Sequence, residues 1–196
     1  TPWAQQDPLL AQTVQALQAG GARADLPDAV RRPLAPPNAW AENIGADKAW
    51  AQGLDGRGVR IAVVATGVDA GHPELQHLRI TGAATDPNGH GTAVASVVAG
   101  RFIGIAPRAV LHAVAPLDEM GHASTDALLR ALSELASAPA DTRADIVCLP
   151  LQTRRMSRPV QEMLQGLAAA GMLLVDAIGN EGSSGTGLPG PDWLLS

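Results

Sequence analysis

The chain has 196 residues, of which 46% are apolar, so it is long enough for one domain with a core and an extension. Its net charge of −5 is spread along the sequence, and no cluster of Lys and Arg with interleaved aromatic residues occurs, which argues against a nucleic-acid partner. No window approaches the roughly 18 apolar residues of a membrane span, and the single cysteine, Cys148, excludes an internal disulfide and is expected to be a buried, inert thiol.

The first 42 residues differ in composition from the rest and are predicted to form an N-terminal extension. Within them, PLLAQTVQALQAG (8–20) has the apolar spacing of a short amphipathic helix that ends at a glycine pair. The following RRPLAPPNAW (31–40) is predicted to be an extended linker stiffened by proline. The pattern fits a loosely attached arm, and it fits equally a segment packed on the main domain or on a partner.

Beyond residue 42 the pattern alternates between short apolar runs and helix-like stretches. Strands are predicted at 59–65, 109–114, 144–150 and 172–178, and helices at 91–100, 124–138 and 158–171. Ser124 is placed to cap the second helix, and Gly171 is placed to end the third. The alternation predicts an α/β domain over residues 43–196, with a mostly parallel sheet and helices on both faces.

Three residues stand where a parallel sheet usually places its chemistry, at strand ends and helix starts. His90 is flanked by glycines at a predicted helix start, where it could be a catalytic group or a helix cap. Asn180 follows the last predicted strand and could donate a hydrogen bond above the sheet or serve a turn. Ala65 ends the first strand, and its methyl group can carry no chemistry.

Five segments, in this order, resemble the subtilisin-like serine peptidases (subtilases) from about Asn43 to Gly185. They are NIGADKAW with GRGVRIAVV, ATGVD with HPEL, HGT followed by AVASVVAG, GIAP, and IGNEG. The resemblance implies a three-layer subtilisin-like fold that lacks the C-terminal part of the family domain. It also implies that His90 is the remnant of the general base and Asn180 the remnant of the oxyanion hole.

Departures from the family pattern argue against activity. Ala65 stands where the family places its catalytic aspartate, which orients the histidine and stabilises the imidazolium. The family's nucleophilic serine lies in a Gly-Thr-Ser-Met-Ala turn, and no serine before the last residue, Ser196, has that context. The family's substrate-pairing Ser-Leu-Gly segment is Pro150, Leu151 and Gln152 here, so we expect an altered substrate position at Leu151 and Gln152.

These losses agree with one another, and we expect a catalytically inactive pseudoprotease that acts as a protein-binding or assembly module. Another protein or a second copy is expected to cover the open side of the sheet near residues 145–152 and 172–196. The alternative is the N-terminal part of a split, clipped or engineered serine endopeptidase. Since subtilases are mostly exported and the chain starts at Thr1, a periplasmic or secreted location is expected.

A third hypothesis is a metal site among polar residues of the same region. Its candidate ligands are Asp69, His72, His77, Asp86 and His90. Metal ligation needs three or four converging side chains, and no zinc-type spacing appears, so we expect no metal and no cofactor. Asp69 lies past a turn from Ala65 and is likewise not expected to replace the missing aspartate.

Overall fold

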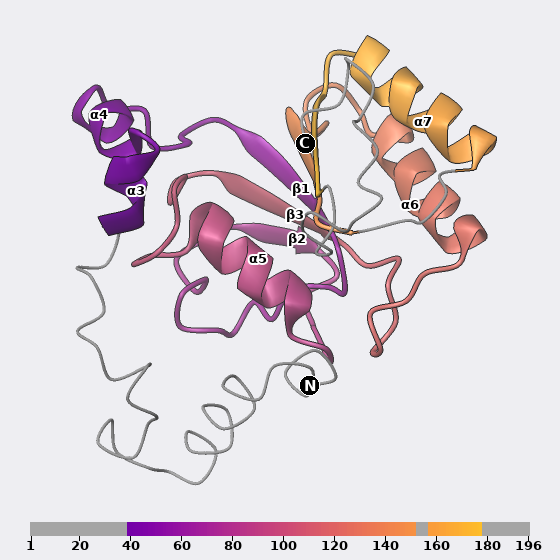
Figure 1. Cartoon of the computed structure of the whole chain (residues 1–196), viewed down its shortest axis with the longest axis horizontal. Coiled ribbons are helices and arrows are strands. Elements are labelled where there is room, and N and C mark those ends of the chain that lie inside the picture. The colour runs from indigo at the N-terminus through magenta and orange to yellow at the C-terminus, as the bar shows by residue number, and fades with distance from the viewer. Residues whose placement is uncertain (1–38, 152–156, 178–196) are drawn as a thin grey trace, which may run out of the picture. The chain divides into compact units, whose positions relative to one another are not determined.

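The computed structural model describes residues 39–151 and 157–177 (Figure 1). They belong to two compact units divided between residues 51 and 52. The first unit contributes two short helices, α3 (Ala39–Asn43) and α4 (Ala46–Ala51). The linker prediction was therefore wrong at its end: no proline follows residue 37 in this stretch, so every backbone N–H is free for helical bonding. The helix predicted at 8–20 lies outside the described residues.

The second unit is an α/β domain. Its strands are β1 (Arg60–Val64), β2 (Ile80–Gly82), β3 (Val110–Val114), β4 (Ile146–Leu149) and β5 (Leu173–Asp176), and its helices are α5 (His90–Ala99), α6 (Thr125–Ser137) and α7 (Arg158–Ala169). The four predicted strands and three predicted helices are confirmed, the last strand as far as the described residues reach. β2 was not predicted, because three residues are too few to show an apolar alternation.

The sheet is parallel throughout, with the strand order β2-β3-β1-β4-β5. β1 is central: Val63 pairs with Ala113 of β3 on one side and with Cys148 of β4 on the other. A strand with neighbours on both edges and helices on both faces must be apolar throughout. This explains why Ile61 to Val64 form an unbroken apolar run that is at most 5% exposed.

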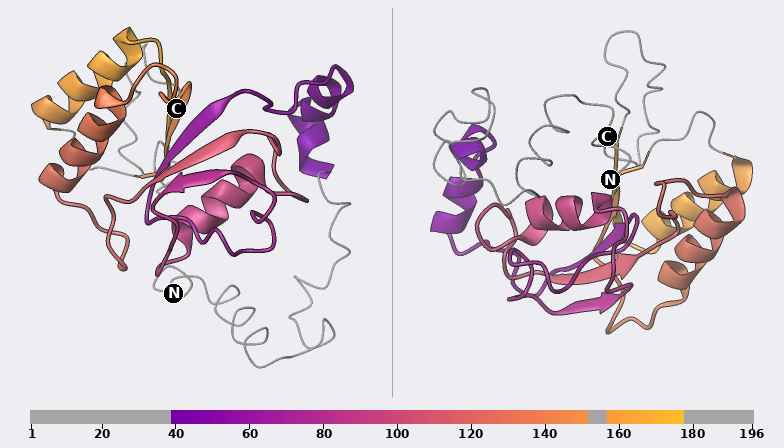
Figure 2. Two further views of the ribbon diagram at one scale, coloured as in Figure 1. Left: turned by 180° about the vertical axis from the view of Figure 1, so that it is seen from behind. Right: turned by 90° about the horizontal axis from the view of Figure 1, so that it is seen from below.

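Helices cover the two faces of the sheet and form two separate cores (Figure 2). α5 packs on β1 and β3, and the core on this face includes Val63 and Ala95. α6 and α7 pack against each other on the opposite face, where Val64 and Leu132 are buried. The arrangement is the three-layer α/β fold that the sequence predicts.

The predicted helix signals are confirmed in their geometry. Ser124 Oγ accepts a hydrogen bond of 3.1 Å from the Ala127 N–H at the start of α6. After α7, Gly171 has a left-handed φ of +91°, and its N–H donates to Ala168 O at 2.9 Å. A residue with a side chain would be strained in this conformation, so glycine ends the helix here.

The β4–β5 end of the sheet is covered unevenly. Leu149 and Leu174 point into the α6–α7 core, so alternation along each strand turns Cys148, Leu173 and Val175 toward the other face. Leu173 is 46% exposed, and Cys148 and Val175 are half-buried. We call these three residues the open sheet face. Cys148 is thus less buried than the sequence predicted.

Candidate functional site

The carboxyl end of β1 and the start of α5 meet at Ala65. Ala65 is fully buried, its N–H donates to Val114 O at 2.9 Å, and its carbonyl accepts from the Leu117 N–H at 3.2 Å. A Cβ placed on Gly91, the second residue of α5, would lie 3.2 Å from the Ala65 Cβ. The side chain at position 65 therefore points at the helix start that carries His90.

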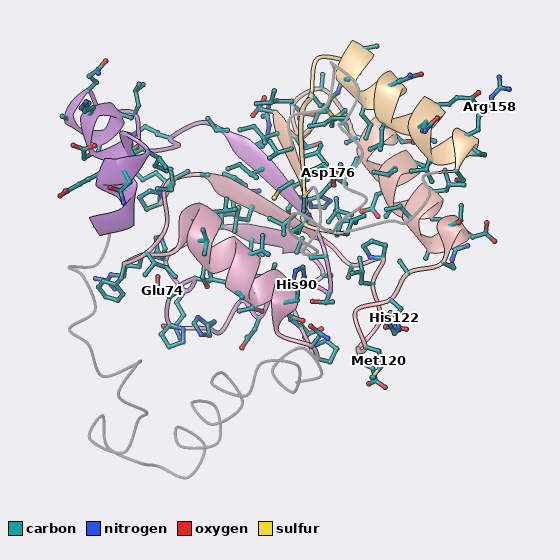
Figure 3. The ribbon with its side chains drawn as sticks, viewed as in Figure 1. Glu74, His90, Met120, His122, Arg158 and Asp176 are labelled. Atoms are coloured by element: carbon teal, nitrogen blue, oxygen red, sulfur yellow. The ribbon has the colours of Figure 1, made fainter. Side chains whose placement is uncertain are left out.

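His90 is the first residue of α5 (Figure 3). Its ring does not cap the helix: the cap position is Gly89, and the His90 N–H donates to Asn88 Oδ1 at 3.1 Å. The Nδ1 atom of His90 is buried and has no hydrogen-bond partner among the described residues. In a catalytic triad this nitrogen donates to the aspartate. Ala65 supplies no oxygen for that bond.

Asp86 caps the same helix from the preceding loop. Its Oδ1 accepts from Thr66 Oγ1 at 2.8 Å, Gly89 N–H at 2.9 Å and Asn88 N–H at 3.2 Å, while Oδ2 accepts from Thr92 Oγ1 at 2.7 Å and Thr92 N–H at 2.8 Å. Burial alone would raise the pKa of Asp86, but these hydrogen bonds outweigh it and hold the pKa below its ordinary value. The charged carboxylate also suits the positive end of the helix dipole.

Neither neighbouring carboxylate supplies His90 Nδ1 with the acceptor that Ala65 does not provide. The two carboxylate oxygens of Asp86 accept hydrogen bonds from five donors, and His90 is not among these donors. Asp69 Oδ1 accepts from the Gly71 N–H at 2.9 Å, and the Asp69 N–H donates to Thr92 Oγ1 at 2.9 Å. Both aspartates therefore brace the loops around α5.

Glycines let the backbone segments of this site approach closely. A Cβ on Gly91 would meet the carbonyl oxygen of Gly67 at 2.0 Å. Gly67 itself has a left-handed φ of +105°, and a Cβ there would meet the carbonyl oxygen of Thr85 at 2.0 Å. The glycines of the TGV and HGT segments are thus required by packing, whatever the site does.

Asp176 was not singled out from the sequence, although a charge directly after the apolar run LLV is a signal. It ends β5 and is half-buried (Figure 3). Burial raises the pKa of Asp176 to about 6, an effect that a hydrogen bond from the Ala177 N–H partly offsets. Burial, together with the charge of Asp176, also raises the pKa of the Cys148 thiol. A raised thiol pKa disfavours the nucleophilic thiolate.

The predicted substrate segment follows β4. Leu151 is half-buried against the α6–α7 core, and its N–H donates to Leu149 O at 2.8 Å in a tight turn. Pro150 has no N–H to donate. Gln152 and Asn180 lie outside the described residues.

Within the described ranges, no group of three or more His, Cys, Asp or Glu side chains converges well enough to hold a metal ion. Two candidate ligands have protein partners instead: His72 Nδ1 accepts from the Glu74 N–H at 3.3 Å, and His77 Nε2 lies 3.0 Å from Pro107 O. None of the described helices is long and apolar enough to span a bilayer.

The family model for the subtilase family matches residues 56–192. The parallel sheet, the His-Gly-Thr helix start and this match agree, and the chain belongs to the subtilase family.

Individual relatives are similar at about 30% identity. Subtilisin DY of Bacillus licheniformis is 32% identical over 157 residues, which cover 73% of this chain and 55% of that protein. The minor extracellular protease Epr of Bacillus subtilis is 32% identical over 153 residues, covering 72% and 23%. The major intracellular serine protease of the same species is 31% identical over 157 residues, covering 71% and 48%. The chain therefore spans from about a quarter to just over half the length of these relatives.

Proposed function

We propose that this subtilase-family chain is a catalytically inactive pseudoprotease that acts by binding another protein. The observation that carries the proposal is the buried Nδ1 of His90, which has no hydrogen-bond partner among the described residues, near Ala65, the residue that directly follows β1. Without that acceptor the imidazole is neither oriented nor stabilised when protonated. In related triads, loss of the aspartate's function alone lowers kcat by about 10⁴.

In this proposal the other site residues are remnants as well. His90 keeps the place of the general base because its helix start is fixed by Asp86, and Asn180 keeps the place of the oxyanion hole. Leu151 and Gln152 form the altered substrate segment. The missing N–H of Pro150 and the engaged N–H of Leu151 support a loss of backbone pairing to substrate.

The binding partner is proposed to cover the open sheet face, near residues 145–152 and 172–196. Cys148 of β4 and Leu173 and Val175 of β5, the edge strand of the described sheet, present this apolar surface. Removing apolar area from water contributes about 25 cal/mol per Å² to a complex, and the entropy lost on association offsets part of this gain. The partner is either another protein or a second copy of this chain.

Light scattering coupled to size-exclusion chromatography tests the binding role. We expect the chain, of 20.1 kDa, to elute at twice that mass or with a co-purified protein. Leu173→Glu should release the partner, because a charge on the open sheet face opposes burial. Leu54→Glu is the matched control, since Leu54 is 64% exposed elsewhere in the same unit. A wild-type chain that stays monomeric at high concentration would contradict the proposal.

A fluorophosphonate probe, applied to the native assembly, tests the absence of catalysis. Activated serine nucleophiles react with such probes, so we expect no labelled band. Labelling of this chain or of any co-purified chain would overturn the proposal that the protein is a pseudoprotease.

The alternative is an N-terminal part of a split, clipped or engineered serine endopeptidase. Two observations support it: the hydrogen bonds of Thr66 and Asp86 that hold the helix start at His90 are in place, and the relatives are named proteases. The length of the encoded gene product separates the two proposals. A longer product with a Gly-Thr-Ser turn would support the peptidase.

Two further parts of the proposal concern organisation and location. Residues 1–42 are proposed as an extension to a domain of residues 43–196, and limited proteolysis should cleave first within the extension.

We propose a periplasmic or secreted protein. The relatives' names include an extracellular and an intracellular protease, so fractionation of producing cells is the deciding measurement.

A further inference from the structure

A groove of about 730 Å³ opens on the α6 face of the sheet, at the amino ends of β1 and β3. His90 and Ala65 lie at the opposite, carboxyl ends of the strands. The register aligns Val110 with Arg60 and His112 with Thr81, so these side chains form the floor of the groove. The end of α6 and the loop that follows it form the walls. The volume is typical of a site for a small ligand.

Most charged groups of the groove are already paired. Arg60 Nε donates to Arg143 O at 2.6 Å and Nη1 to Asp141 O at 2.7 Å, while Nη2 lies 3.4 Å from the Asp145 carboxylate. His112 lies between two partners: its Nδ1 is 2.9 Å from Thr81 Oγ1, and its Nε2 is 3.6 Å from Glu134 Oε1.

Two opposite charges remain. Arg79 and Asp141 are exposed and line the groove, and neither the guanidinium nor the carboxylate has a partner among the described residues. Arg79 directly precedes β2, where its carbonyl accepts from the Leu111 N–H at 3.1 Å. Asp141 lies at the end of the Arg60 side chain, because Nη1 of Arg60, the first residue of β1, donates to the main-chain oxygen of Asp141. Among the residues that the structure describes, the groove thus offers one cation and one anion without a side-chain partner, on either side of β3.

The arrangement of the strands limits the ligand. The backbone of Arg79, directly before β2, and that of Arg60 on β1, whose side chain holds Asp141, lie two strand spacings apart, about 10 Å. The ammonium and carboxylate of a single amino acid are too close together to reach both sides, whereas an extended chain of two or three residues spans about 7–10 Å. Apolar atoms of Val110, Leu135 and Ala138 lie in the same groove and can receive an apolar side chain.

We propose that this groove binds short free peptides, with the peptide carboxylate on Arg79 and its ammonium on Asp141. The proposal is independent of whether the chain hydrolyses peptide bonds, because no residue of the His90 region takes part.

Isothermal titration of the whole chain with the tripeptide Ala-Leu-Ala tests the site. We expect the peptide with two free ends to bind, and N-acetylation or C-amidation to weaken binding at least tenfold each. Arg79→Ala should abolish the difference in affinity between the free and the amidated peptide, and should leave the difference between the free and the acetylated peptide in place. Asp141→Ala should abolish the difference in affinity between the free and the acetylated peptide, and should leave the difference between the free and the amidated peptide in place.

Arg158→Ala and Glu162→Ala are the matched controls, because they remove one exposed charge of each sign on α7, outside the groove. Both should bind the free peptide as the wild type does, and circular dichroism should show all variants folded. The proposal is overturned if capping either end has no effect, if the Arg79 and Asp141 variants bind like the controls, or if no binding is detected at millimolar peptide.

Discussion

The hydroxyl of Thr66 donates to Asp86 at 2.8 Å and accepts from the main-chain N–H of Gly91 at 3.0 Å. One side chain therefore joins the end of β1 to the start of α5. Thr66 directly follows Ala65, and Gly91 directly follows His90, so this contact lies next to both residues of the candidate site. These bonds fix the helix start that carries His90, while Ala65 offers no acid beside it.

The first prediction concerns Asp86. Asp86→Asn should lower the free energy of unfolding by about 1–3 kcal/mol at pH 7, because charge-assisted hydrogen bonds at the helix start are lost. Its folded pKa is lower than the ordinary 3.8, so its contribution is present above that pH and is lost as the pH falls through the folded pKa. Urea unfolding at several pH values measures this. Asp69→Asn, which removes a carboxylate with one backbone donor, should lower the free energy of unfolding by less. An equal decrease for the two variants would contradict the capping role of Asp86.

The second prediction concerns position 65. Ala65→Asp should place a carboxylate within reach of His90 Nδ1 and give the imidazole a hydrogen bond of about 1.5–3 kcal/mol in strength. Proton NMR should then show a downfield, slowly exchanging imidazole N–H resonance that the wild type lacks. Ala65→Asn has a similar volume and is the control, with a weaker resonance. Folding of both variants is checked by thermal melting. A folded Ala65→Asp chain without the resonance would show that position 65 does not face Nδ1.

The third prediction separates two helical glycines. Gly91→Ala should destabilise the fold by about 1–3 kcal/mol, because the new methyl group would overlap the Gly67 carbonyl oxygen. Gly166→Ala, inside α7 with no atom within 4 Å of the added Cβ, should stabilise it by about 0.5–1 kcal/mol. Chemical denaturation of the two variants gives both values. The prediction fails if the two substitutions change stability in the same direction.

The fourth prediction is a pH dependence. The pKa of Asp176 is raised to about 6, so the folded chain binds a proton more tightly than the unfolded chain, and this stabilisation is lost as the pH rises from about 4 through 6. Asp176→Asn should therefore stabilise the protein at pH 8 by about 1–2 kcal/mol, discounted for the solvent around this half-buried group. At pH 4 the variant should match the wild type. Glu119→Gln neutralises an exposed carboxylate and should show no such difference between the two pH values.

The fold was largely predictable because its main strands are apolar runs between clear helix signals. Four strands are long enough to show this pattern, and Ser124 and Gly171 mark helix ends by local chemistry alone. The third residue of β2, Gly82, carries no such signal, and β2 is held by pairing with β3, which the local sequence does not reveal.

The candidate site was predictable only in part. His90 and Ala65 stand out in the sequence because the family resemblance predicts a role for each of these two positions. The role of Asp86 depends on Thr66, 20 residues earlier in the chain, and on a helix that begins beyond it. The raised pKa of Asp176 arises from burial by distant segments, and the peptide groove combines three strands with the end of α6. Such features come from tertiary packing, and the local sequence gives at most a weak signal, such as the charge of Asp176 directly after the apolar run LLV.

The central position of β1 also sets an order of events during synthesis. β1 pairs with β3 and with β4, and the Arg60 N–H donates to the Asp145 carboxylate, 85 residues later in the chain. At a translation rate of about 5–20 residues per second, β1 waits roughly 4–17 s for its second neighbour. During that interval an apolar strand has at least one edge unpaired on the ribosome, where it is open to aggregation or to a chaperone.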